Sequence, residues 1–206
     1  MTFDSSDFII RKARMSDRNH LRAMQIDSLR TLAARCYTRE EIEAFITFVG
    51  TMDDRLIADS TYFVVEAKGR LLASGGWSRQ AASHAAGLPA DPTAAKVRNL
   101  FVHRDWARHG LGRSLVERIE LEALYAGFDR MELNTPLSGA SFWRALGYQA
   151  TRPIELNMPD GIRFRGLSMS KSLVDEAAPA LGDDAVPLPP TARGTGDATC
   201  CLRQAA

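Results

Sequence analysis

The fold is decided by the stretch VRNLFVHRDWARHGLGRSL, residues Val97–Leu115. It opens with an apolar run of strand length, Val97–Val102, which ends at the polar residues His103–Asp105. A helix is predicted from about Gly110, because apolar residues then recur every four positions, at Leu111, Leu115 and Ile119. Gly110 and Gly112 therefore lie at a strand-to-helix turn.

This turn is suited to an anionic ligand. The first backbone N–H groups of a helix have no partner within the helix and point beyond its end. Glycine has no Cβ to keep a pyrophosphate away from those amides, and basic side chains gather around the turn at Arg108, His109 and Arg113. Because two glycines also occur in ordinary tight turns, the longer sequence context has to decide between the two interpretations.

The context excludes two common phosphate-binding loops and matches a third. No Gly-Lys-Ser/Thr follows the glycines, and Leu115 stands where the third glycine of a dinucleotide fingerprint belongs. Residues 107–112 instead resemble the acyl-CoA loop of the GCN5-related N-acetyltransferases (GNAT), which is (Gln/Arg)-x-x-Gly-x-(Gly/Ala) between a strand and a helix. Ala107 departs from the first position of that pattern. The segments LFVHRDW, before the loop, and FWRALGY, after it, are also similar to this family.

The resemblance covers residues 8–171 and implies an α/β (α+β) fold. We expect a mixed, mostly antiparallel sheet of about six or seven strands, splayed at its central strands and flanked by about four helices. The implied activity is transfer of an acetyl group from acetyl-CoA to a primary amine by direct attack in a ternary complex, without a metal. The alternative is a degenerate domain that binds acyl-CoA as a sensor or partner module.

The resemblance also assigns the residues that would bind the donor. In this family the strand before the glycine loop pairs with the pantetheine arm, and the loop amides bind the pyrophosphate. The expected acetyl-CoA contacts are Leu100, Phe101 and Val102 on the strand and Arg108, His109, Gly110, Leu111, Gly112 and Arg113 in the loop. The backbone N–H of Val102 could polarise the thioester carbonyl.

The acceptor side is assigned less completely. The family's first two helices and their connection wall the acceptor site, which places Arg35, Cys36 and Tyr37 there. We expect Tyr37, Trp77 and Trp143 to contact the acceptor, although a core position is the alternative for Trp77. Cys36 is expected to be a small buried apolar residue rather than a nucleophile.

The proton route has no clear residue in the sequence. Many members of the family place a tyrosine before the xxxGF segment as general acid, whereas this chain has Trp143, whose indole N–H cannot supply a proton at neutral pH. Tyr148 is the nearest phenol, but an aromatic residue at this position usually packs inward. The catalytic residues are therefore left unassigned, and the candidate bases are Glu66, Glu132, His84 and His103.

Composition limits the partners. The chain has 206 residues, 45% hydrophobic and 25% charged, and its 26 basic and 25 acidic residues nearly cancel. This balance favours neither nucleic acid nor an anionic membrane as partner. Three cysteines without disulfide or zinc spacing, and no apparent signal or membrane-spanning segment, predict a cytoplasmic protein. No hydrolase motif is present; whether the chain forms a homodimer is left open.

The rest of the chain is predicted to complete one domain. Thr38 and Glu41 form a capping box that starts a second helix, after a first helix capped by Ser16. Strands are expected at residues 8–14, 62–67, 71–77, 130–134, 149–156 and 163–171, with a short helix from Ser138 and a long loop at 80–95. Residues 175–206 are rich in Ala, Pro and Gly and are predicted to form a disordered tail.

Overall fold

The computed structural model describes residues 8–79 and 93–174. These residues belong to one compact unit, Met1–Asp175, and a second unit, Glu176–Ala206, lies outside the described part. The predictions for the tail, for His84 and for most of the loop at 80–95 therefore concern residues that the structure does not describe.

The described residues form a seven-stranded sheet with the order β1-β2-β3-β4-β5-β7-β6. Neighbouring strands are antiparallel except for β4 and β5, which are parallel. The strands are β1 (Ile9–Lys12), β2 (Tyr62–Ala67), β3 (Arg70–Ser78), β4 (Ala95–Val102), β5 (Arg130–Pro136), β6 (Gln149–Asn157) and β7 (Arg163–Ser172). The expectation of a mixed, mostly antiparallel sheet flanked by helices is confirmed.

Helices cover both faces of the first half of the sheet. The α-helices are α1 (Arg18–Leu32), α2 (Arg39–Ala44), α3 (Asp54–Ala58), α4 (Leu111–Tyr125) and α5 (Ala140–Ala145), and short helical turns are η2 (Met15–Asp17), η3 (Phe45–Val49), η5 (Arg104–Trp106) and η6 (Leu137–Gly139). Along β2, Tyr62 and Val64 pack with α1 and α3, whereas Phe63 and Val65 pack with α4. Because successive side chains of a strand point to opposite faces, α1 and α4 lie on opposite sides of the sheet.

Local sequence signals account for the helix ends. The capping box at α2 is formed as predicted, because Thr38 Oγ1 accepts from Glu41 N and Glu41 Oε2 accepts from Thr38 N. The prediction that Ser16 caps the first helix is wrong, since Asp17 occupies the N-cap position of α1. The side chain of Asp17 is instead bound by Arg11 and by the backbone N–H of Arg14.

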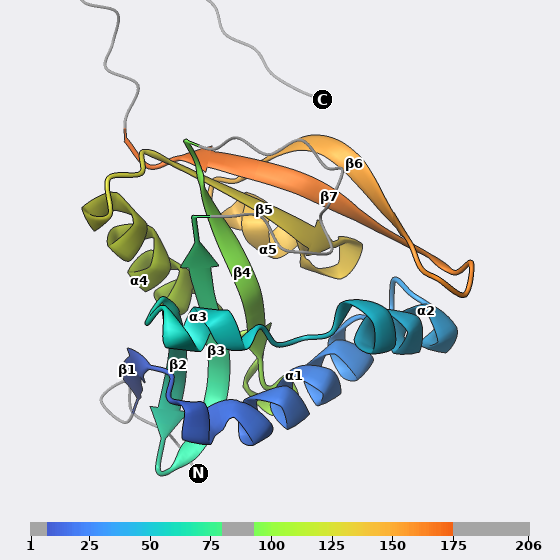
Figure 1. Ribbon diagram of the computed structural model, residues 1–206, viewed down its shortest axis with the longest axis horizontal. Helices are drawn as coiled ribbons and strands as arrows, with labels where there is room; N and C mark the ends of the chain where they lie inside the picture. Colours follow the sequence, from blue (N-terminus) through green and yellow to red (C-terminus); the bar gives the residue numbers. More distant parts are fainter. Residues whose placement is uncertain (1–7, 80–92, 175–206) are drawn as a thin grey trace, which may run out of the picture. The chain divides into compact units, whose positions relative to one another are not determined.

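The central strands separate after a very short pairing. Strands β4 and β5 are registered only at Ala95↔Met131 and Lys96↔Glu132, after which they diverge. Figure 1 shows β4 running away from β5, so that β5, β7 and β6 form a second half of the sheet. The splayed centre that the resemblance implied is therefore present, and it creates an unpaired edge of β4 within the sheet.

A β-bulge lies in β4 beside this opening. Ser74 pairs with Phe101 and Gly76 pairs with Arg98, so two residues of β4, Asn99 and Leu100, stand opposite Gly75 alone. Asn99 has φ +52°, a left-handed conformation that asparagine tolerates better than most residues. The extra residue bends β4 at the place where the strand leaves its neighbour.

Candidate active site

The glycine turn has the geometry expected of an open helix N-terminus. Arg108 and Gly110 have φ +66° and +80°, so the chain turns sharply just before α4. Gly110 is the N-cap of α4, and no side chain caps its first amides. A Cβ on Gly110 would meet no atom within 4 Å. Glycine is therefore required there by the backbone conformation rather than by crowding.

Gly112 is restricted for a different reason. A Cβ at this position would lie 3.2 Å from two ring carbons of Phe142 and 3.4 Å from Val102 Cγ2. The first turn of α4 is thus packed closely against the end of β4 and against α5. This packing brings the uncapped amides of α4 next to the diverging edge of β4.

The register of β3 and β4 decides which backbone groups are free at that edge. His103 N donates to Leu72 O at 2.7 Å, and hydrogen-bonded pairs alternate with non-hydrogen-bonded pairs in an antiparallel ladder. The pair Val102↔Ala73 therefore points its β4 backbone groups away from β3, whereas Phe101 faces β3 through its pair with Ser74. Of these two predicted donor contacts, Val102 has the backbone orientation required and Phe101 does not.

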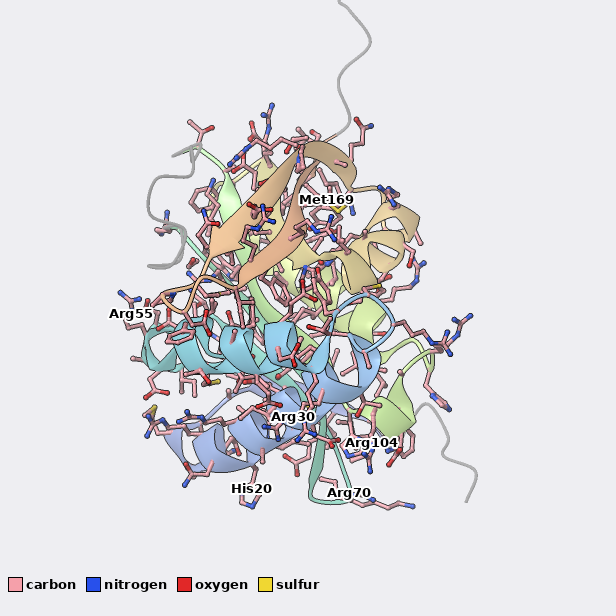
Figure 2. All side chains as sticks on the ribbon, turned by 90° about the vertical axis from the view of Figure 1, so that its right-hand side faces the viewer. His20, Arg30, Arg55, Arg70, Arg104 and Met169 are labelled. Atoms are coloured by element: carbon pink, nitrogen blue, oxygen red, sulfur yellow. The ribbon has the colours of Figure 1, made fainter. Side chains whose placement is uncertain are left out.

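A cavity of about 640 Å³ opens at the divergence of β4 and β5. It lies between α1, η3 and α3 on one side and β5, β6 and β7 on the other; Figure 1 shows α1 and α3 in its lower part and β5, β6 and β7 in its upper part. In Figure 2, Arg55 on α3 and Met169 on β7 mark two parts of its lining. Its volume falls in the range of small-molecule sites.

Two ion pairs extend from β4 into this cavity. Lys96 Nζ lies 2.8 Å from Glu132 Oε2, and Arg98 Nη2 lies 3.0 Å from Asp53 Oδ2. The Lys96 and Arg98 side chains are only 8% and 10% exposed. Burial lowers the pKa of Arg98, and the pKa of Asp53 is also lowered, because hydrogen bonds and charge from Arg55 and Arg98 outweigh the effect of burial. Charges this buried require such partners.

A buried polar network supports the bulge from the α1 side. Tyr62 OH donates to Asn99 O at 2.8 Å and accepts from Gln25 Nε2 at 2.8 Å. Gln25 Nε2 also lies 3.2 Å from Ser74 Oγ, and Asn99 Nδ2 donates to Thr51 O at 2.6 Å. Burial raises the pKa of Tyr62, so the phenol stays protonated and can donate to Asn99. These contacts hold the backbone of Asn99 in its unusual conformation.

The three predicted acceptor residues occupy different environments. Trp143 lines the cavity, and its ring packs edge-to-face against Phe142 and Tyr148. Trp77 is 6% exposed, packs against Phe128 and is not part of the cavity lining, which matches the alternative of a core position. Tyr37 is also outside the lining.

Tyr37 instead joins three parts of the chain. Its hydroxyl donates to Arg165 O and accepts from Leu137 N, the latter at 2.7 Å, and its ring stacks on Phe164. Burial raises the pKa of Tyr37 to about 12. This phenol connects the end of α1 with β7 and η6, so its place in the structure is that of a support for the cavity wall. Cys36 beside it is exposed, and the expectation of a buried Cys36 is wrong because the turn after α1 lies at the surface.

The candidate residues for the proton route lie in different parts of the structure. Glu132 lines the cavity, whereas Glu66 and His103 do not. Glu66 pairs with Arg11 at the other end of the sheet, 2.7 Å away, and His103 Nδ1 accepts from Asp105 N. Tyr148 is 2% exposed and lies outside the cavity lining, and burial raises its pKa further above the usual range. Glu132 is thus the only carboxylate among the predicted candidates that reaches the cavity.

Several lining residues were not singled out from the sequence. The charged ones among them are Arg18, Arg22, Asp53, Asp54, Arg55, Lys96, Arg98 and Arg152. Asp53 and Arg98 are far apart in the chain, and the α3 helix that Asp53 caps was not predicted at all. Within residues 8–79 and 93–174, no group of three or more His, Cys, Asp or Glu side chains is arranged to hold a metal.

Comparison with known proteins assigns this fold. Residues 58–150 match the sequence model of the acetyltransferase (GNAT) domain. This part of the chain is therefore similar to the GNAT domain, and the resemblance drawn from the glycine loop, which lies within it, is confirmed. A comparison with curated proteins finds no match.

Solved structures with the same fold include three that are only 16–20% identical to this chain. A GCN5-related N-acetyltransferase from Rhodopseudomonas palustris is 19% identical, with a TM-score of 0.66 over 84% of this chain and 100% of that chain. PaiA N-acetyltransferase from Thermoplasma acidophilum, in complex with coenzyme A, is 16% identical, with a TM-score of 0.59 over 80% of this chain and 98% of that chain. YncA from Salmonella typhimurium, with acetyl-CoA, is 20% identical, with a TM-score of 0.57 over 84% of this chain and 98% of that chain.

Among the described residues, no helix is both long enough and apolar enough to cross a bilayer.

Proposed function

We propose that the domain of residues 8–171 transfers an acetyl group from acetyl-CoA to a primary amine, by direct attack in a ternary complex. The observation that carries this proposal is the diverging edge of β4. The uncapped amides of α4 lie beside its end, and the charged cavity opens where it leaves β5. The ligands of PaiA and YncA, coenzyme A and acetyl-CoA, support the same class of donor.

The donor would be held mainly through backbone groups. The loop from Arg108 to Arg113 offers the N-terminal amides of α4 to a pyrophosphate, with two arginines to balance its charge. The outward-facing backbone of Val102 is suited to hydrogen-bond the pantetheine arm or the thioester carbonyl. Ser28 Oγ already donates to Val102 O at 2.8 Å, which leaves the N–H of Val102 as the group for the carbonyl oxygen.

The acceptor would enter from the cavity. Its neutral amine attacks the thioester carbonyl carbon, a C–N bond forms, the C–S bond breaks, and the CoA thiolate leaves. The amine loses one proton in this exchange, and the thiolate gains one. Glu132 Oε2 is engaged by Lys96, but Oε1 has no hydrogen-bond partner within the described residues and is available to accept the amine proton, directly or through water.

Trp143 stands where many of these enzymes have a phenol. Its indole N–H cannot protonate the thiolate, so the proton comes from water or another group. A thiol has a reference pKa of only about 8.5, which makes the thiolate a tolerable leaving group. The domain is therefore chemically competent for transfer without a phenol at this position.

The proposal is tested by measuring free CoA release from acetyl-CoA across a panel of primary amines, with calorimetric titration of acetyl-CoA alongside. Acetyl-CoA binding together with amine-dependent CoA release is the expected result. Binding without turnover on any amine would favour the acyl-CoA sensor over the enzyme. Absence of acetyl-CoA binding would overturn both.

A further inference from the structure

The cavity that opens between α1 and β6 carries an excess of positive charge. Among the described residues, its basic side chains are Arg18, Arg22, Arg55, Lys96, Arg98 and Arg152, and its acidic side chains are Asp53, Asp54 and Glu132. An excess of arginine in a partly enclosed site favours an anionic ligand, because the guanidinium offers several donors in a planar fork. The charges that have no partner within the site are the ones available to such a ligand.

All three acidic side chains are engaged. Asp54 lies 2.8 Å from Arg18, and Glu132 lies 2.8 Å from Lys96. Asp53 is shared between two arginines, Arg98 at 3.0 Å and Arg55 at 3.1 Å. Arg22 and Arg152 are the two basic lining residues that remain, and within residues 8–79 and 93–174 neither has an acidic partner.

The two unpaired arginines come from opposite walls. Arg22 belongs to α1 and Arg152 belongs to β6, and Figure 1 shows α1 in its lower part and β6 in its upper part. Arg152 is partly buried and Arg22 is exposed, so both guanidinium groups can be reached from the cavity mouth. An anion bound there would be contacted from two sides.

These arginines are not placed for the phosphates of CoA. None of the residues from Arg108 to Arg113 lines the cavity, and the first turn of α4 packs against Val102 and Phe142 instead. The glycine turn, with its own arginines, would therefore bind the pyrophosphate at a separate site. The charge on α1 and β6 is left for the other substrate.

We propose that the acceptor is a small amine that also carries an anionic group, of the amino acid type. Its anion lies between Arg22 and Arg152, and its amine lies toward the free Oε1 of Glu132. This inference rests on the proposed function, since it identifies the acceptor of that reaction. The cavity of about 640 Å³ favours a small molecule over a peptide chain.

The test measures binding and turnover separately on matched ligands. Leucine, phenylalanine and glutamate are each compared with the corresponding α-amide and with the amine that lacks the α-carboxylate. Calorimetric titration in the presence of CoA gives the affinities, and CoA release from acetyl-CoA gives kcat/KM. At least one amino acid is expected to bind about tenfold or more tighter than its amide, as a charge-assisted contact to two guanidinium groups implies.

Two variants locate the effect. Arg22→Gln and Arg152→Gln should each reduce the affinity ratio of amino acid to amide to within about threefold. Arg70→Gln is the matched control, because Arg70 lies at the β2–β3 turn (Figure 2), outside the cavity lining, and should leave the ratio unchanged. The ratio in the wild-type protein should also fall as salt is raised, a measurement that does not depend on any variant folding.

Each outcome separates this inference from the enzymatic proposal. A carboxylate preference in binding that both variants abolish supports the inference even if no acetyl group is transferred. Equal affinity for amino acids and amides, or no binding of any amino acid, would overturn it. Tighter binding of an acidic peptide than of every free amino acid would also overturn it. Acetylation only of amines that lack an anionic group would overturn this inference and leave the proposed function standing.

Discussion

Lys96 Nζ lies 2.8 Å from Glu132 Oε2 at the last position where β4 and β5 are paired. The ion pair thus closes the base of the opening from which the proposed donor and acceptor sites extend. The Lys96 side chain is 8% exposed and the Glu132 side chain 28% exposed, so the ammonium depends on the carboxylate while the carboxylate still reaches the cavity. One pair of residues therefore joins the two halves of the sheet and supplies the candidate base.

Replacing Glu132 by Gln tests that candidate base. The amide keeps the shape of the side chain but cannot take up a proton, so kcat should fall about a hundredfold or more at neutral pH. Steady-state kcat across pH, with a saturating amine, is the measurement, and Glu117→Gln on the exposed face of α4 is the control. A variant that melts at the wild-type temperature and keeps wild-type kcat would show that Glu132 has no part in proton transfer. Lower stability is also expected, because the ion pair between Glu132 and the buried Lys96 is lost.

The glycine turn can be tested by substitutions that differ only in backbone preference. Gly110 has φ +80° and open space around it, so Gly110→Val should weaken acetyl-CoA binding by several-fold to about a hundredfold, on the order of 1–3 kcal/mol. Gly110→Asn should retain more affinity, since asparagine tolerates the left-handed region. Calorimetric titration of acetyl-CoA distinguishes them. Equal affinity of wild type and Gly110→Val would mean that this turn does not bind the donor.

The role of Trp143 can be separated from that of a general acid. Trp143→Phe should keep kcat within about tenfold of wild type, because loss of a true general acid typically costs about a hundredfold or more. Trp143→Tyr should raise kcat if the phenol reaches the thiolate. Since Trp143 packs against Phe142 and Tyr148, the melting temperature of each variant must be recorded first. A thousandfold loss in a well-folded Trp143→Phe variant would assign the indole N–H a specific role in the transition state.

Alkaline pH should weaken the fold partly through Tyr37. A tyrosine in the unfolded chain ionises near pH 10, whereas burial raises the pKa of Tyr37 in the folded chain to about 12. The contribution of the neutral phenol is fully present below pH 10 and is lost as the pH rises from 10 to 12. Tyr37→Phe should therefore be less stable than wild type at pH 8, and the difference should shrink by about 1–2 kcal/mol by pH 12. Urea unfolding across this range measures it.

Tyr125→Phe provides the control for that experiment. Tyr125 is 82% exposed, and its replacement should give a difference from wild type that does not change with pH. If the Tyr37→Phe difference also stays constant, the hydroxyl of Tyr37 is not held in its neutral form by the fold. The contacts to Leu137 and Arg165 would then have to be weaker than their geometry indicates.

The C-terminal residues after the sheet should be dispensable for folding. The last strand ends at Ser172, and Leu173 N still donates to Asp129 O at 2.7 Å. A chain ending at Val174 should melt within a few degrees of the full chain, because the removed segment is rich in Ala, Pro and Gly and contains no aromatic residue. A chain ending at Gly166 removes part of β7 and should not fold. Differential scanning calorimetry compares the melting temperatures. A much lower melting temperature for the chain that ends at Val174 would show that the tail packs on the domain.

The sequence predicted most of the scaffold because its signals are local. The capping box at Thr38 and Glu41, the β2–β3 hairpin and the turn at Gly110 each depend on a few consecutive residues, and each is present. The short helix α3 was missed, since its five residues carry too little periodicity to be recognised. Local patterns therefore defined the frame but not every element that walls the cavity.

The site was only partly predictable because its contacts are long-range. Glu132 appeared as one of four candidates, and only the pairing of β4 with β5 shows that it reaches Lys96 and the cavity. The pair of Arg98 and Asp53 joins positions 45 residues apart. Tyr37 was expected at the acceptor because of its place in the chain, but its hydroxyl is used by Leu137 and Arg165. The spacing of residues in the sequence does not predict contacts between positions so far apart.

The bulge at Asn99 reverses the inside–outside pattern of β4. Before the bulge, the even-numbered Lys96 and Arg98 face the cavity, and the odd-numbered Val97 packs with α4. After the bulge, the odd-numbered Phe101 packs with α1 and α3, and the even-numbered Val102 packs near α4. Deleting one residue here would restore a regular ladder in which Phe101 still pairs with Ser74 and the later side chains keep their faces, but the bend and the left-handed position at Asn99 would be lost. The extra residue is thus required for the bend of β4 and for the contacts of Asn99 with Tyr62 and Thr51, rather than for the side on which the later side chains lie.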